Sequence, residues 1–289
     1  MGVRGPQTRE QRHETIIFRS LACLTLLSVS LILTLVAYLA VNGLRPLVQD
    51  LMRAAIGTDT SQLLPLLVET LSIVIVSTLL ALPLGIAAGI YLCEYVAHSR
   101  LAKGAQDTIA NLANIPPIVY GLFGWGALAH GKLGASLATI MLTLSVWMLP
   151  KITAITTQAL EQVPLAFRRE SQALGASRWQ TSIYAVLPYA RRQIAADVLG
   201  AMARLSGETA PMIILVGVEH NLGLEVPGML SYHLYRWLVD SIRSNQAPPY
   251  AAALLLLSIA LLLQFLAVII DPTRKETVQD LGSQEGRGW

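Results

Sequence analysis

The sequence predicts an all-α membrane protein with six transmembrane helices, from its composition and the lengths of its apolar runs. Hydrophobic residues make up 54% of the 289 residues, charged residues only 13%, and the mean hydropathy is +0.55. Soluble domains carry about 25% charged residues, and a spanning helix needs about 20 apolar residues in succession. Five uncharged runs are long enough, and a sixth apolar stretch is interrupted by charges. The five runs are Ser20–Leu44, Thr70–Cys93, Thr108–Gly131, Leu133–Pro150 and Ser244–Ile270, and the interrupted stretch is Ile194–Gly217.

The distribution of basic residues orients these helices. The first run is too long for the apolar region of a signal peptide, so we expect it to be retained. Six crossings place both termini on one side, which then holds fifteen of the 21 Lys and Arg residues, Lys151 included, against five on the other. Basic residues gather on the cytoplasmic side, so both termini are predicted to be cytoplasmic, in a cell (inner) membrane. The expected organisation is an N-terminal tail (1–19), a first helix with its outer loop (20–65), a five-helix core (66–270) and a C-terminal tail (271–289).

Two short motifs bear on how the second and third spans pack. Gly85 and Gly89 have the small-xxx-small spacing that lets two helices approach closely. Pro116 and Pro117 remove two backbone donors from the third span and predict a kink or a break. A break would line a cavity, where the freed carbonyls are satisfied; a kink filled by neighbouring helices is equally compatible with the sequence.

Enzymes and nucleic-acid-binding proteins find no support in the sequence. The net charge is only +3, which argues against nucleic-acid binding. The two cysteines and five histidines show no metal-ligand spacing, so no metal site is expected. Residues Gly126–Lys132 match the start of a phosphate-binding P-loop, but Leu133 stands where Ser or Thr is required. We therefore expect no catalytic activity and no ATPase in this chain.

The interrupted fifth span holds the first candidate site. On one continuous helix Asp197, Arg204 and Glu208 would share a face, with Arg204 and Glu208 spaced to form an ion pair. An arginine within the bilayer is costly and marks a functional candidate. The pair either clips this helix to a neighbour or places Arg204 on a polar path, where its planar fork suits an oxyanion.

The second candidate site is the cytoplasmic stretch 163–188, named here the coupling segment. Its pattern predicts a short helix from Leu165, a break at Gly175, a second short helix, and a stop at Leu187-Pro188. Apolar side chains stand between arginines in both helices. Such a helix–turn–helix below the membrane is suited to the groove of a partner protein.

The coupling segment resembles the coupling motif of ABC importer permeases. Ala173-Leu174-Gly175 and Leu187-Pro188 carry this resemblance, which covers most of the chain from about Thr70. The run Ser206-Gly207-Glu208-Thr209-Ala210-Pro211 resembles that of the PstA-type phosphate permeases, which implies a type I importer fold and phosphate as substrate. Permeases for molybdate, sulfate or phosphonate share the coupling motif and remain the alternative.

The resemblance also implies partners and residue roles. The partners would be a PstC-like permease subunit, a PstB-like ATPase dimer that binds the ATP and Mg, and a PstS-like phosphate-binding protein, with membrane lipid around the chain and no cofactor bound by it. The family's motif glutamate falls at Arg169 here, and Glu170 takes the following position. Asp197, Arg204 and Glu208 are the expected pathway residues. The expected ATPase-coupling residues are Arg169, Glu170, Ala173, Leu174, Gly175 and Trp179.

Overall fold

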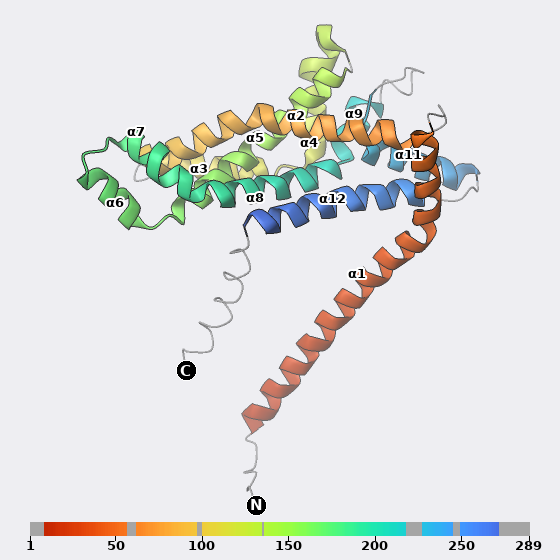
Figure 1. Cartoon of the computed structure of the whole chain (residues 1–289), viewed down its shortest axis with the longest axis horizontal. Coiled ribbons are helices and arrows are strands. Elements are labelled where there is room, and N and C mark those ends of the chain that lie inside the picture. Colours follow the sequence, from red (N-terminus) through yellow and green to blue (C-terminus); the bar gives the residue numbers. More distant parts are fainter. Residues whose placement is uncertain are drawn as a thin grey trace, which may run out of the picture.

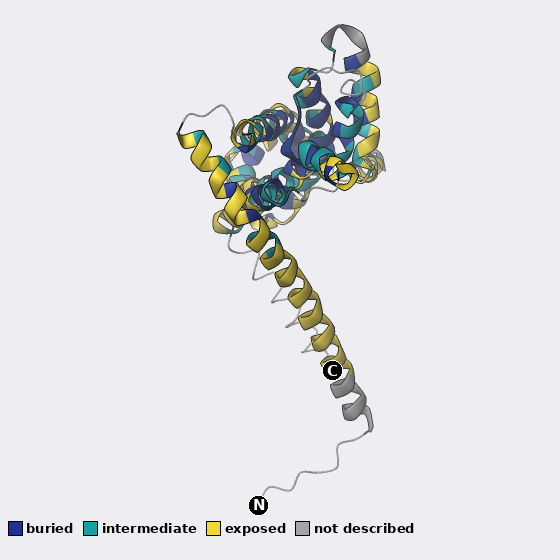
Figure 2. Ribbon diagram, turned by 90° about the vertical axis from the view of Figure 1, so that its right-hand side faces the viewer, coloured by how far each residue is buried: buried dark blue, intermediate teal, exposed yellow. Residues whose placement is uncertain are grey.

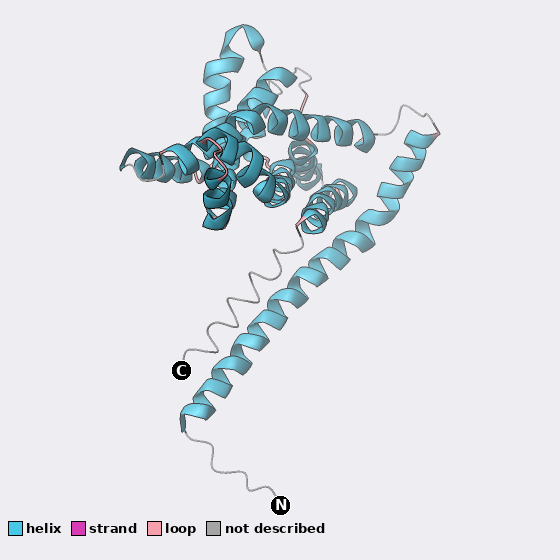
Figure 3. Ribbon diagram, turned by 60° about the vertical axis from the view of Figure 1, so that its left-hand side comes forward, coloured by secondary structure: helices cyan, strands magenta, loops and turns pink. Residues whose placement is uncertain are grey.

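The computed structural model is helical throughout the part of the chain that it describes, without a strand in that part (Figure 3). The described residues are 9–56, 62–96, 100–134, 136–217, 227–244 and 249–271. The predicted all-α membrane fold is confirmed. Most of the predicted C-terminal tail and the first eight residues lie outside the described residues.

Four helices are long and apolar enough to cross a membrane, and a bent pair makes a fifth candidate. In Figure 1 the long helices other than α1 run in roughly the same direction as one bundle. The four helices are α1 (Arg9–Ala55), α2 (Leu63–Ile90) with its π-helical extension η1 (Tyr91–Tyr95), α5 (Leu137–Glu161) and α12 (Tyr250–Ile270). The remaining helices are α3 (Arg100–Ala113), α4 (Pro117–Gly124) with η2 (Trp125–Leu133), α6 (Leu165–Ala173), α7 (Arg178–Thr181) with η3 (Ser182–Val186), α8 (Leu187–Ser206), α9 (Ala210–Leu215) and α11 (Leu230–Ser244).

Helix α1 stands apart from the bundle along most of its length (Figures 1 and 2). It begins at Arg9, inside the predicted tail. Only its C-terminal part packs on α12, where the Tyr38 and Tyr250 hydroxyls lie 3.0 Å apart. Gly43 faces the Tyr250 carbonyl so closely that any β-carbon would clash with it. The apolar surface before this contact is exposed, as expected of a helix that faces lipid.

The predicted proline break is present as a sharp bend. Helices α3 and α4 meet at 88°, with Pro116 in an extended conformation between them. The Tyr120 hydroxyl donates to the Leu112 carbonyl at 2.8 Å, which links the two sides of the break. Because a proline cannot supply the donor that an α-helix needs, the chain turns here instead of continuing.

Helix α5 corrects one sequence expectation. The uncharged run ends at Pro150, which predicts that Lys151 lies in a cytoplasmic loop. Instead α5 continues through Pro150 to Glu161, and Lys151 lies inside the helix. At 1.5 Å per residue, Lys151 is about 15 Å from the helix end. Lys151 is therefore a charged residue within a spanning segment, and not part of the basic cluster that orients the protein.

Helix α8 corrects a second expectation. It carries Asp197 and Arg204 as predicted, but it ends at Ser206, and the chain leaves helical structure at Gly207–Thr209 before α9 begins. Glu208 and Pro211 thus lie beyond α8. Within the described residues no hydrogen bond or ion pair joins Arg204 to Glu208. The predicted i, i+4 pair requires a continuous helix, and the helix stops first.

The bundle core is built on the pair α2 and α5. A β-carbon at Gly85 would lie 2.6 Å from Ile152 Cγ2, and one at Gly89 would lie 2.6 Å from Thr156 Cβ. The two glycines predicted to allow close packing therefore do so, against α5. Trp147 and Met148 of α5 are almost completely buried in the same core.

We expect Gly89→Leu to destabilise the protein by roughly 1–3 kcal/mol, because the larger side chain must force α2 from α5. Thermal unfolding of the purified protein in detergent measures the change. Gly104→Leu is the matched control, since nothing lies within 4 Å of a β-carbon at Gly104. Equal melting temperatures for the two variants would contradict the packing.

Candidate functional site

The coupling segment forms the predicted helix–turn–helix at one end of the bundle (Figure 1). The predicted stop at Leu187-Pro188 is wrong, because the chain remains helical from α7 through η3 into α8, where the proline lies in the first turn and needs no donor. Helix α6 ends at a Schellman motif: the Gly175 amide donates to Gln172 O at 2.9 Å and the Ala176 amide to Ser171 O at 3.2 Å. This motif needs a left-handed residue, and Gly175 has φ of +88°. The predicted break at Gly175 is confirmed, and it explains why glycine occupies this position.

A capping box starts the second helix of the segment. The Ser177 hydroxyl accepts from the Gln180 amide at 3.3 Å, and the Gln180 side chain accepts from the Ser177 amide at 2.8 Å. The Ser171 and Thr181 hydroxyls, 3.1 Å apart, join α6 to α7. Both helix ends and the turn between them are thus fixed by hydrogen bonds, so the segment has a defined shape.

Three large apolar or aromatic side chains are exposed on the outer surface of the coupling segment. Leu174 is 90% exposed, Trp179 58% and Tyr184 76%. The other predicted coupling residues, Arg169, Glu170 and Ala173, are exposed on α6. None of the residues predicted to contact an ATPase is buried against the bundle. The surface is therefore available to a partner protein.

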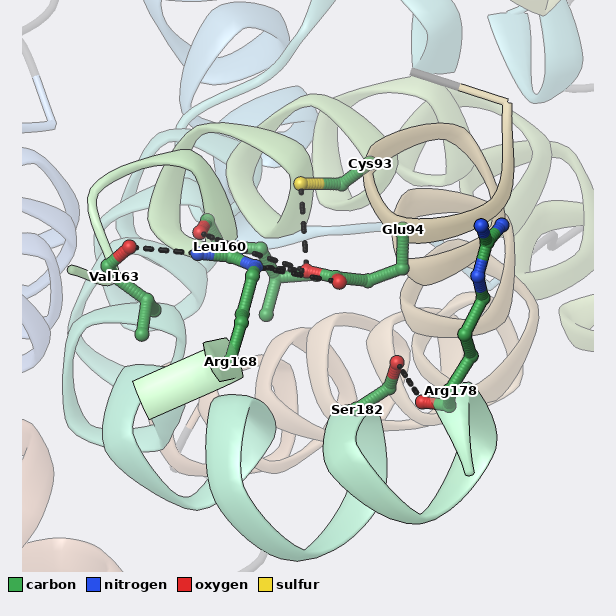
Figure 4. Close-up of polar contacts among 7 residues, drawn as sticks. All are labelled: Cys93, Glu94, Leu160, Val163, Arg168, Arg178 and Ser182. Atoms are coloured by element: carbon green, nitrogen blue, oxygen red, sulfur yellow. Dashed lines mark hydrogen bonds and ion pairs between the residues drawn. The ribbon is translucent and has the colours of Figure 1, made fainter. Parts of the chain in front are cut away.

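The inner surface of α6 is held by Arg168, a residue that the sequence reasoning passed over. Its guanidinium contacts Glu94 of η1 at 2.8 Å and donates to both Glu94 oxygens. The same group donates to Val163 O at 2.7 Å and to Leu160 O at 2.8 Å, at the end of α5 (Figure 4). The hydrogen bond to Glu94 raises the pKa of Arg168 further above its ordinary value. Arg168 therefore stays charged at every physiological pH.

A cavity of about 550 Å³ adjoins this ion pair. It lies between η1, α3, the end of α5 and the coupling segment, and its lining includes Lys103, Glu161 and Arg178. In Figure 4 the Arg178 side chain rises beside Glu94 without a drawn contact to it. The coupling segment thus meets the bundle across a polar, open space that the Arg168–Glu94 pair bridges.

A second cavity lies along the bundle between α5 and α8. Its volume is about 400 Å³, and polar groups from several helices line it. Asp197, Gly200 and Arg204 of α8 share this cavity, as their predicted common face implies, whereas Glu208 is not part of its lining. The polar lining residues are Asn114, Lys151, Gln158, Asp197, Arg204 and Gln264.

Lys151 supplies a second cation to this cavity. Its ammonium lies 3.3 Å from the centre of the buried Trp147 ring, a cation–π contact. Lys151 is also attracted by Glu208 and repelled by Arg204. The structure therefore gives Glu208 a different electrostatic partner from the predicted one. Lys151 of α5, Arg204 of α8 and Glu208 after α8 thus lie close enough to influence one another.

No group of three or more His, Cys, Asp or Glu side chains among the described residues is arranged to hold a metal ion. The polar groups of the second cavity are cations, carboxylates and amides instead. Cations and amide donors are the groups that bind an oxyanion, and carboxylates accept hydrogen bonds from its protonated forms.

The family of the chain follows from a match to a family of transport proteins. Residues 81–276 match the binding-protein-dependent transport system inner membrane components. The chain belongs to this family. It is a multi-pass membrane protein of a transport system, as its apolar helices also indicate.

Several named proteins resemble this inner membrane component. "Phosphate transport system permease protein PstA 1" of Mycobacterium tuberculosis (strain CDC 1551 / Oshkosh) is 32% identical over 201 residues, which cover 68% of this chain and 66% of the relative, slightly less than two thirds of its length. PstA of Pasteurella multocida (strain Pm70) is 28% identical over 74% of this chain and 78% of its own. "Probable ABC transporter permease protein YqgH" of Bacillus subtilis (strain 168) is 35% identical over 53% and 52% of the two chains.

Solved structures support the fold. Two inward-facing structures of the MetNI methionine ABC transporter match 72% of this chain, with TM-scores of 0.57 and 0.59 at 21% and 19% identity. The matches cover 95% and 94% of the MetNI chains. The inner membrane component thus shares its helical arrangement with a chain of an ABC transporter.

We expect Gly175→Ala to speed hydrogen exchange at the Ala176 amide by about tenfold, because a left-handed alanine costs about 1–2 kcal/mol. The Ala176 amide is the donor that closes the Schellman motif, so its exchange reports the opening of this turn. Gly175→Asn is the matched control, since asparagine tolerates this conformation better. Exchange in Gly175→Ala as slow as in the unmodified protein would contradict the assigned role of Gly175.

Proposed function

We propose that the chain is a transmembrane permease subunit of an ATP-driven inorganic phosphate importer. The observation that carries the proposal is the pair of cations, Lys151 and Arg204, that line one cavity from two different helices, α5 and α8. Two similar proteins are named as phosphate transport permeases. Charged groups inside a spanning bundle are rare and mark ion pathways, and an ammonium with a guanidinium suits a multiply charged oxyanion.

In this proposal the cavity forms half of the translocation pathway. Arg204 and Lys151 contact the anion, while Asp197 and Glu208 limit the excess positive charge so that the anion is released as well as bound. The carboxylates offset the two cations when the path is empty, which lowers the cost of holding those cations within the membrane. Asn114, Gln158 and Gln264 supply neutral polar groups along the same wall.

The chain works with separate proteins in this proposal. The family description supports a substrate-binding protein as one partner, and the exposed apolar tips of the coupling segment suit the groove of an ATPase. A PstC-like permease, a PstB-like ATPase dimer and a PstS-like binding protein are the proposed partners. ATP and Mg are bound by the ATPase, no cofactor is bound by this chain, and the chain is not itself an enzyme.

Transport follows from rigid-body motion. Closure of the ATPase dimer displaces residues 165–184, and η3 carries that displacement directly into α8, because the helix continues without a break. Arg204 is part of α8, so its position relative to Lys151 on α5 changes as the complex switches between outward and inward states. An importer of molybdate, sulfate or phosphonate is the second candidate, since any oxyanion suits two cations.

We expect Arg204→Ala and Lys151→Ala each to reduce phosphate uptake by about 10- to 100-fold, because each removes a charge-assisted bond worth roughly 1.5–3 kcal/mol. Uptake of radiolabelled phosphate by cells that express the complete complex measures the effect, with subunit copurification as the check on assembly. Arg192→Gln, an exposed change on the same helix outside the cavity, is the control. Normal uptake by an assembled Arg204→Ala complex would contradict the pathway role, and competition with sulfate or molybdate tests the second candidate.

Both termini are cytoplasmic in the proposed topology, with the coupling segment on the same side. A fluorescent protein that folds only in the cytoplasm, fused after Trp289, is expected to fluoresce. A fusion of the same protein within residues 57–61 is the opposite-side control and is expected to remain dark. A dark C-terminal fusion in a complex that still transports would contradict this orientation.

A further inference from the structure

The coupling segment is attached to the membrane helices by the chain at both of its ends and by one side chain. At its start the short stretch 162–164 joins α5 to α6. At its end the chain runs without a break from α7 through η3 into α8, so α8 moves whenever the segment moves. The third attachment is the Arg168 side chain, which reaches from α6 to η1 and to the end of α5 (Figure 4). This side-chain attachment has no part in the transport step proposed above.

The Arg168 contacts involve all three nitrogens of the guanidinium. Nε donates to both Glu94 oxygens at 3.2 and 3.3 Å, Nη1 to Val163 O, and Nη2 to Glu94 Oε1 and Leu160 O. The two side chains are only 17% and 11% exposed. A planar fork with this many acceptors is held in one orientation, whereas a lysine offers a single point of contact. The pair therefore fixes both the orientation of α6 and its distance from η1 and the end of α5.

The two helices that Arg168 holds are packed tightly against each other. Helices α2 and α5 are in contact through Gly85 and Gly89 without room for a β-carbon. Leu160 O and Val163 O lie at the end of α5, and Glu94 lies in the extension of α2. A displacement of α6 is thus applied to the combined α2–α5 unit, which carries Lys151.

We propose that the Arg168–Glu94 ion pair is the positioning contact through which the coupling segment moves the α2–α5 unit, while η3 moves α8. The proposal rests on the proposed transport function. Arg168 and Glu94 are positioning residues, since they contact neither the anion nor ATP. With the pair intact, one displacement moves both cation-bearing helices in a fixed relation. Without it, only the stretch 162–164 connects α6 to α5, so α5 follows the segment incompletely while the ATPase closes and hydrolyses ATP, and hydrolysis is no longer matched by transport.

A purely structural pair predicts a different outcome. Loss of a structural contact lowers the amount of assembled complex, but each assembled complex still transports the usual number of anions per ATP. Loss of a positioning contact raises the ATP consumed per anion in complexes that remain assembled. The ratio of the two rates, measured on purified complex, separates these cases because it does not depend on how much protein folds.

The experiment uses the complete complex with its ATPase and binding protein, reconstituted in proteoliposomes with inorganic phosphate as the transported probe. Glu94→Gln removes the charge and keeps the shape, and Arg168→Lys keeps the charge and removes the fork. We expect each variant to raise the ATP hydrolysed per phosphate transported by roughly threefold or more, because charge-assisted bonds are about twice as strong as neutral ones. Glu161→Gln, a carboxylate of the adjoining cavity that does not contact Arg168, is the control and is expected to keep the unmodified ratio.

Two further results decide the proposal. An unchanged ratio in assembled Glu94→Gln and Arg168→Lys complexes would overturn it. If neither assembles, the charge-reversed pair Glu94→Arg with Arg168→Glu is measured; a ratio below that of Arg168→Glu alone supports the proposal, and a ratio equal to it counts against it. If the unmodified complex carries another oxyanion and not phosphate, the ratio is taken with that anion, so that failure of the substrate assignment is distinguished from failure of the positioning role.

Discussion

The arrangement of this protein depends on the cost of keeping positive charge inside a membrane. Lys151 lies within the apolar helix α5 and Arg204 near the end of α8, and neither could face lipid without severe penalty. Lys151 is held against the Trp147 ring, and both cations share a polar cavity with Asp197. Helix α8 packs against both α5 and α12, and its Asp197 and Arg204 line this cavity.

Hydropathy predicted most of the fold, because bilayer thickness imposes a length that can be read directly. The break at Pro116 and the turn at Gly175 were also predictable, since both follow from backbone chemistry at single residues. The close approach of helices at Gly85 and Gly89 was predictable in the same way, from the spacing of two small residues. In each case the conformation follows from the chemistry of one or two residues, and the tertiary structure does not override it.

The candidate site was harder to predict, because the role of each residue depends on which residues surround it in the folded chain. In the sequence Lys151 separates two uncharged runs, and a lysine in that place is typical of a loop. The structure shows instead that α5 continues through Lys151, so its charge lies within a spanning helix. Arg168 sits beside Arg169 and Glu170, and the helix phase of α6 decides which of the three faces the bundle. The prediction that Glu208 lies on the same helix as Arg204 was wrong, but the sequence did contain a sign of the break. A glycine such as Gly207 shortly before Pro211 is typical of one helix ending and another beginning.

Helix α1 has a consequence for the way the chain meets the bilayer. Its 47 residues extend over about 70 Å, more than twice the ~30 Å depth of the hydrocarbon. Figure 1 shows the helix changing direction near its C-terminal end, where Pro46 removes a backbone donor. A rod of this length must either lean strongly or emerge into water. The tilt of α1 therefore depends on the thickness of the hydrocarbon, since a thinner membrane requires a greater tilt or leaves a longer part of the helix in water.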